Sequence, residues 1–170
     1  GFSLLFQRLL FGAKIIFNES LDSLNSQSLD LKQYDKIIVT SAIDEFFNYI
    51  YGKLDWVGLE FESTKIESSG DVLATPVVNL NTNKNLIRVV DYNQFSKEKS
   101  NTHIVVKEKP SRKRNFYPVD TPKNAELLAK YLELSKAYKN VIFAGRLGTY
   151  KYLDMDETIQ NALNLSKEVL

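Results

Sequence analysis

The residues best suited to chemistry lie close together in the segment 141–156. An apolar run there ends at Gly145, where the missing side chain lets a ligand approach the backbone closely. Arg146 follows, and its guanidinium is always charged and can bind phosphate oxygens in pairs. A helix predicted to begin at Asp154 would add the positive end of its dipole. The spacing therefore predicts a phosphate or cofactor site, although Asp154 with Glu157 three residues later also fits a capping box without any function.

A second arginine, Arg88, lies inside the apolar run 86–92, on the face predicted for Val90 and Tyr92. A guanidinium held on a sheet is a suitable ligand for a diphosphate. A salt bridge to one of the 21 acidic residues is the commoner explanation, because unpaired buried charge is rare. Taken alone, Arg88 does not distinguish the two.

Composition excludes several other kinds of site. The basic residues of 107–114 precede Phe116 and Tyr117, but 22 basic against 21 acidic residues leave a net charge of only +1, so no nucleic-acid partner is expected. His103 is the only histidine and cysteine is absent, which argues against a metal site and excludes disulfides. No apolar run approaches the roughly 20 residues that span a bilayer. We therefore expect a cytoplasmic protein with no membrane partner.

The elements that position these residues change type along the chain. Apolar residues at helical spacing predict a short first helix that Gly12 closes. Continuous apolar runs at 13–17 and 36–40, on either side of a polar stretch at 19–32, predict strands buried on both faces, as in a parallel sheet. This pattern is typical of a nucleotide-binding α/β layer.

The middle third predicts an antiparallel sheet instead. From residue 54 the apolar period becomes two, with Val57 and Phe61 predicted on one face and Trp56 on the opposite, wet face. Further short strands are predicted at 72–80, 86–92 and 102–107.

Helical pattern returns after Pro118. Thr121 is a suitable N-cap and Pro122 a suitable first helical residue. A buried strand at 140–144 and a closing helix at 154–169 follow. We therefore expect an α+β fold, in which an antiparallel β-sheet domain is inserted in an incomplete, Rossmann-like α/β layer. The expected boundaries are 1–45 and 120–170 for the α/β parts and 46–119 for the insertion.

Six blocks of the sequence resemble the UDP-galactopyranose mutases, a flavin-dependent family, in the same order and with matching spacing. They are residues 34–47, 52–62, 77–79, 87–92, 116–119 and 145–155. Six ordered blocks are far more specific than any single one.

The resemblance implies a fold and an activity. The α/β layer would bind FAD, and the enzyme would interconvert UDP-galactopyranose and UDP-galactofuranose, with reduced FAD as the nucleophile and UDP as the departing group. Arg88 would be the catalytic residue that binds the diphosphate. The motifs also imply roles for six other residues: Tyr117 and Tyr152 at the diphosphate, Asn79 at the sugar, and Arg146, Asp154 and Met155 at the flavin.

The sequence also departs from the family pattern. It shows neither the glycine-rich dinucleotide fingerprint nor the family's helical domain and mobile lid, so the resemblance implies a C-terminal half that is inactive alone and does not retain FAD. Ser41 replaces a glycine, Phe116 replaces a tyrosine, and Asn93-Gln94 replaces Lys-His. A divergent or non-catalytic mutase-like protein that acts as a nucleotide-sugar binding module therefore stays open, as do an unrelated binding module and a homodimer.

Overall fold

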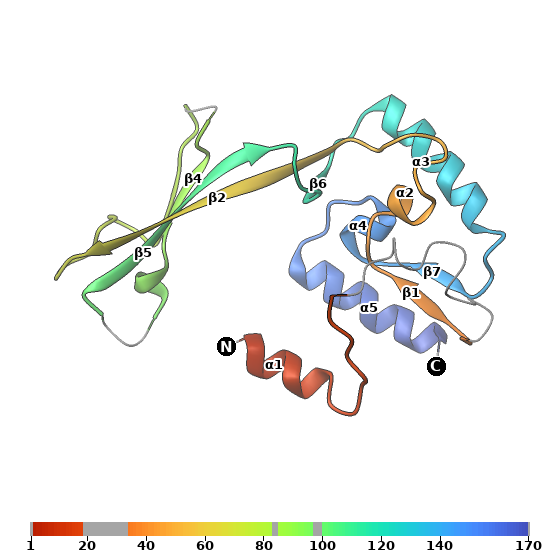
Figure 1. Ribbon diagram of the computed structural model, residues 1–170, viewed down its shortest axis with the longest axis horizontal. Coiled ribbons are helices and arrows are strands. Elements are labelled where there is room, and N and C mark those ends of the chain that lie inside the picture. The colour runs from red at the N-terminus through yellow and green to blue at the C-terminus, as the bar shows by residue number, and fades with distance from the viewer. Residues whose placement is uncertain (1, 19–33, 83–84, 97–99, 170) are drawn as a thin grey trace.

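The computed structural model describes residues 2–18, 34–82, 85–96 and 100–169. Figure 1 shows an extended antiparallel sheet at one end of the molecule and a helix-rich part with a small parallel sheet at the other. The predicted polar stretch 19–32 and part of the turn before residue 86 lie outside the described residues. The expected α+β class is confirmed, whereas the domain boundaries stay predictions.

The larger sheet has five strands in the order β3-β4-β5-β2-β6, and its pairings are antiparallel. The strands are β2 (Trp56–Glu67), β3 (Val77–Asn79), β4 (Arg88–Asp91), β5 (Thr102–Ser111) and β6 (Tyr117–Pro118). A 3-10 helix, η3 (Tyr92–Phe95), follows β4 directly. The longest pairing in this sheet joins β2 and β5 in one ribbon, in which every residue from Gly58 to Glu67 pairs with a residue of β5. The strands predicted at 72–80 and 86–92 are shorter than expected, with three and four residues.

The predicted one-sided burial of β2 is wrong. Residues 60–65 are all exposed, because this half of the ribbon has water on both faces. Trp56, predicted on the wet face, is only 6% exposed, because the first residues of β2 pack against the helical part of the molecule. The alternation of apolar and polar residues predicted the strand correctly, but it did not predict which parts of the molecule cover its faces.

The smaller sheet is a parallel pair of β1 (Ile37–Val39) and β7 (Val141–Phe143). Its helices are α2 (Ile43–Phe46), α3 (Pro122–Ser135), α4 (Gly145–Thr149) and α5 (Met155–Val169). The cap predicted for α3 is confirmed, because the Thr121 hydroxyl accepts a hydrogen bond from the Asn124 backbone at 3.2 Å. Helix α4 was not predicted, since two glycines in five residues disfavour a helix.

The buried strand predicted at 13–17 is wrong. These residues are irregular and exposed, and no described strand pairs with them. A parallel strand is stable only when neighbours satisfy its backbone and cover both faces. The preceding helix α1 (Phe2–Leu9) forms as expected and Gly12 follows it with φ +83°, but α1 buries none of its residues.

The core lies where the start of β2 meets α2, α3 and α4. It consists of Ala42, Ile43, Leu54, Trp56, Tyr131 and Tyr150. Two tyrosine hydroxyls tie this region together: Tyr131 donates to the Gly52 carbonyl and Tyr150 to the Asp55 carbonyl, both at 2.6 Å. Burial raises the pKa of both phenols. These contacts and the packed Trp56 join the segment before β2 to the helical part.

Asp44 is a buried acid in this core, 1% exposed. Its Oδ2 accepts a hydrogen bond from the Leu54 backbone at 2.9 Å, while Oδ1 is buried without a partner among the described residues. Burial raises the pKa of Asp44 above its ordinary 3.8 and outweighs the hydrogen bonds that lower it. The charged form therefore costs stability.

This cost predicts a pH dependence. The pKa of Asp44 is higher in the folded protein than in the unfolded chain. As the pH rises from the unfolded pKa to the folded pKa, the contribution of Asp44 to stability should therefore become less favourable. We expect Asp44→Asn to gain stability relative to wild type between acid and neutral pH, because the amide does not ionise. Urea unfolding of both proteins at several pH values, followed by circular dichroism, measures the difference. A difference that does not change with pH would contradict the expected ionisation.

Candidate functional site

Three of the residues that the sequence predicted for a site line one open groove of about 500 Å³: Arg88, Tyr117 and Arg146. They come from β4, β6 and α4, which are far apart in the sequence. The other lining residues are Leu59, Phe61, Glu108, Asn115, Phe116 and Leu147. The groove therefore combines two guanidinium groups with a largely aromatic and aliphatic wall.

Arg88 is held by its two neighbours in the sheet. Asn79 on β3 and Glu108 on β5 stand directly opposite it in the strand register. Its Nε donates to Asn79 Oδ1 at 2.9 Å, and its NH1 lies 3.4 Å from Glu108 Oε2. The Glu108 side chain is 8% exposed but that of Arg88 is 45% exposed. The two explanations of Arg88 are thus compatible, because the salt bridge orients a guanidinium that still faces solvent.

Arg146 lies against two tyrosines. The Tyr117 and Tyr152 rings stack with their centroids 5.7 Å apart, and the Arg146 guanidinium carbon is 4.9 Å and 5.0 Å from the two centroids. Arg146 also donates to the backbone carbonyls of Leu153 and Phe116. The described residues offer the Tyr117 and Tyr152 hydroxyls no hydrogen-bond partner, so both are available to a ligand.

Asp154 and Met155 lie beside this cluster at the start of α5, and neither lines the groove. The Asp154 backbone N–H donates to Glu157 Oε2 at 2.9 Å, which is the capping interaction predicted from their spacing. Met155 is 72% exposed. Their contacts within the protein therefore indicate helix capping and leave Met155 open to an occupant.

A second feature lies where β1 and β7 end. Ligands of open α/β sheets bind beside the carboxyl ends of the parallel strands. There the Ser41 hydroxyl is buried without a hydrogen-bond partner in the described part of the chain. Gly145 has φ +71°, and a Cβ built on it would meet only Thr40, at 4.0 Å. An unsatisfied hydroxyl beside open backbone fits a polar cofactor edge.

Residues 1–152 match the family model described as GLF: UDP-galactopyranose mutase. The chain belongs to this family. The resemblance seen in the sequence is confirmed, and members of this mutase family use FAD.

Curated relatives include UDP-galactopyranose mutases and a dTDP-fucopyranose mutase. A probable UDP-galactopyranose mutase of Klebsiella pneumoniae is 34% identical over an alignment of 145 residues that covers 82% of this chain and 37% of that protein. The UDP-galactopyranose mutase of Mycoplasma pneumoniae is 33% identical over 79% of this chain and 36% of that protein. A dTDP-fucopyranose mutase of Escherichia coli is 30% identical over 98% of this chain and 46% of that protein. The mutase-family chain thus spans less than half the length of these relatives.

Sequence reasoning missed Glu108 and Asn115 of the groove and misplaced Phe61. Glu108 was not singled out, because its pairing with Arg88 depends on the register between β4 and β5, which the sequence does not show. Phe61 was assigned to a buried face but is 50% exposed at the groove. No described group of three histidines, cysteines or acids could hold a metal ion, and no described helix is long and apolar enough to cross a membrane.

Proposed function

We propose that this chain supplies the C-terminal part of a flavin-dependent mutase that interconverts UDP-galactopyranose and UDP-galactofuranose. The observation that carries the proposal is the groove, in which Arg88, Tyr117 and Arg146 meet within a chain of this family. Galactofuranose made in this way would serve the synthesis of galactofuranose-containing glycans.

Each residue contributes a defined task to this proposal. The Arg88 guanidinium binds the diphosphate and stabilises the charge that grows on it as the sugar–phosphate bond breaks. Asn79 and Glu108 hold that guanidinium before substrate arrives, which reduces the entropy lost on binding. The hydroxyls of Tyr117 and Tyr152 donate to the phosphates, and the amide of Asn79 contacts the sugar.

FAD fits the end of the parallel pair. Ser41, Arg146, Asp154 and Met155 are the residues that would hold it there, with the buried Ser41 hydroxyl as the clearest unsatisfied group. When bound in reduced form, FAD supplies the nucleophile for the anomeric carbon. The chain's own residues position the substrate and stabilise the departing diphosphate.

The chain by itself should be colourless. None of its seven glycines forms the G-x-G-x-x-G fingerprint that lets a backbone approach the pyrophosphate of FAD closely. We therefore expect no flavin absorbance band after purification, nor after incubation with FAD followed by gel filtration. A flavin band in nearly equimolar amount to the chain would contradict this and would mean that the site at β1 and β7 suffices.

A second substrate comes from the dTDP-fucopyranose mutase, which is 30% identical over 98% of this chain. The groove wall of Leu59, Phe61, Phe116 and Leu147 would also suit a sugar that carries a methyl group in place of a hydroxymethyl group. Both substrates share the nucleoside diphosphate that Arg88 would bind.

Calorimetric titration of the chain with UDP and with dTDP tests the proposal. Binding of either diphosphate supports a nucleotide-sugar site, and the tighter of the two indicates the substrate. Assay of the whole protein that carries this chain, with UDP-galactopyranose and dTDP-fucopyranose in parallel, then separates a mutase from a non-catalytic binding module. Failure of both diphosphates to bind would contradict the proposed site.

A further inference from the structure

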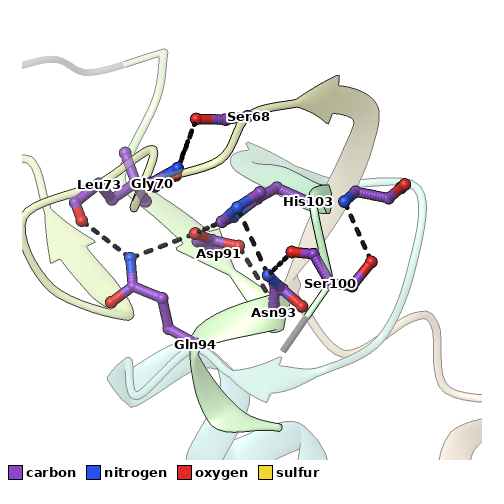
Figure 2. A network of polar contacts seen from close by, with 9 residues as sticks. Ser68, Gly70, Leu73, Asp91, Asn93, Gln94, Ser100 and His103 are labelled. Carbon is purple, nitrogen blue, oxygen red and sulfur yellow. Dashed lines mark hydrogen bonds and ion pairs between the residues drawn. The ribbon is translucent and has the colours of Figure 1, made fainter. Parts of the chain in front are cut away.

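Figure 2 shows a buried polar network around Asp91, the last residue of β4. Arg88, which lines the groove, is the first residue of the same strand. The Asp91 and His103 side chains are 0% and 3% exposed, and the Asp91 carboxylate accepts a hydrogen bond from His103 Nδ1 at 2.8 Å. The same carboxylate accepts from Gln94 Nε2 and from the Asn93 backbone N–H, both at 3.1 Å. Burial alone would raise the pKa of Asp91, but these hydrogen bonds outweigh it and hold the pKa below its ordinary value.

The network also selects one form of the His103 ring. A carboxylate only accepts hydrogen bonds, so the proton on Nδ1 is required. On the other side of the ring, Nε2 lies 3.4 Å from Asn93 Nδ2, which also donates to the Ser100 carbonyl at 2.8 Å. A neutral imidazole with its proton on Nδ1 satisfies both contacts.

The network joins segments on either side of it. Gln94 Nε2 donates to the Leu73 carbonyl at 2.8 Å, in the segment that leads to β3. The Asp91 backbone N–H donates to the Pro76 carbonyl at 2.9 Å, one residue before β3 begins. His103 belongs to β5, on the opposite side of β4. The Asp91–His103 network therefore fixes β4 against both of its neighbours.

This attachment matters because β3 is a short edge strand. It has three residues, and its partner β4 has four. Only three residue pairs hold this register, and a slip of one residue would turn side chains to the opposite face of the sheet. Asn79 and Arg88 face each other in this pairing, so a slip would separate them.

We propose that Asp91 and His103 are positioning residues that hold Arg88 and Asn79 in register for substrate. The role of that pair in substrate binding rests on the proposed function. Asp91 is three residues from Arg88, about 10 Å along the strand, and three residues place it on the opposite face. The Asp91–His103 network thus acts through the strand and not by touching substrate. Asn93 and Gln94, which depart from the family pattern in the sequence, are members of it.

The Nε–H of Arg88 gives a direct readout in the chain itself, because it donates to Asn79. Its nuclear magnetic resonance signal reports that bond without any ligand. We expect His103→Leu, which removes the donor to Asp91, to speed solvent exchange of this N–H about fivefold. His103→Asn should restore slow exchange, because its amide can donate to Asp91 from the place of Nδ1.

Controls separate positioning from general stability. Val141→Ala removes buried apolar atoms from β7 and should lower stability without changing the Arg88 signal. If His103→Leu does not fold, Asp91→Asn keeps the shape and weakens the acceptor of three hydrogen bonds, so faster Arg88 exchange is expected there too. An unchanged Arg88 signal in the folded variants, or an equal change in Val141→Ala, would overturn the positioning role.

Adding UDP to the wild-type chain tests the proposed function separately. A shift of the Arg88 signal supports the substrate site alone. Absence of a shift in wild type would overturn the substrate site, whereas the exchange rates in the His103 variants would still decide the positioning role.

Discussion

Replacing Arg88 with alanine should weaken UDP binding about tenfold or more in the whole protein that carries this chain. A charge-assisted hydrogen bond to phosphate is worth about 1.5–3 kcal/mol, and each 1.4 kcal/mol is a factor of ten in affinity. The guanidinium is already oriented by Asn79 and Glu108, so little entropy is lost when the diphosphate binds. Turnover should fall further than affinity, because charge on the departing UDP grows in the transition state.

Two further variants make the result specific. Arg88→Lys keeps a positive charge beside the nearly buried Glu108 but loses the planar pair of donors, so it should retain stability and still bind UDP weakly. Lys113→Ala is the matched control, since this lysine is 80% exposed and pairs with Glu60 at 2.7 Å. Titration calorimetry with UDP compares all four proteins. Equal affinities for wild type and Arg88→Ala would show that Arg88 serves only its salt bridge.

Features that depend on neighbouring residues in the sequence were predictable. The Thr121 cap and the Asp154–Glu157 capping interaction follow from spacings of three residues, and both are present. The β1 strand was recognised from one apolar run. Local hydrogen-bonding patterns repeat in many proteins, so a short window of sequence is enough to identify them.

Features that depend on register were not predictable. The contacts of Arg88 with Asn79 and Glu108 require the pairing of three strands, and alternation alone leaves that pairing undetermined. The apolar run 13–17 was predicted as a strand but is irregular. An apolar run forms a parallel strand only where other strands flank it, and the sequence of the run does not show its neighbours. The sequence shows His103 only as an isolated histidine, and its pairing with Asp91 depends on the fold.

The groove also depends on a close backbone approach that explains Gly58. A Cβ built on Gly58 would lie 2.2 Å from the Arg114 carbonyl oxygen and 2.9 Å from its carbon. A Cβ atom does not approach another heavy atom this closely in folded proteins, so the segment before β6 would have to move away from β2. That segment continues into Asn115 and Phe116, which line the groove, and Phe116 N–H donates to the Val57 carbonyl at 3.3 Å.

Gly58→Ala should therefore destabilise the chain by about 1–3 kcal/mol, the usual cost of forcing extra atoms into a packed site. The sign is informative, because alanine in an unobstructed strand is better than glycine by about 0.5–1 kcal/mol. Gly70→Ala is the matched control, since a Cβ there meets nothing within 4 Å and should change stability by less than about 0.5 kcal/mol. Urea unfolding followed by circular dichroism measures both, which avoids relying on Trp56 two residues from the substitution. A Gly58→Ala variant as stable as wild type would mean that the 112–116 segment can move away from β2 without loss of folding free energy. The groove wall would then not be held by its contact with β2.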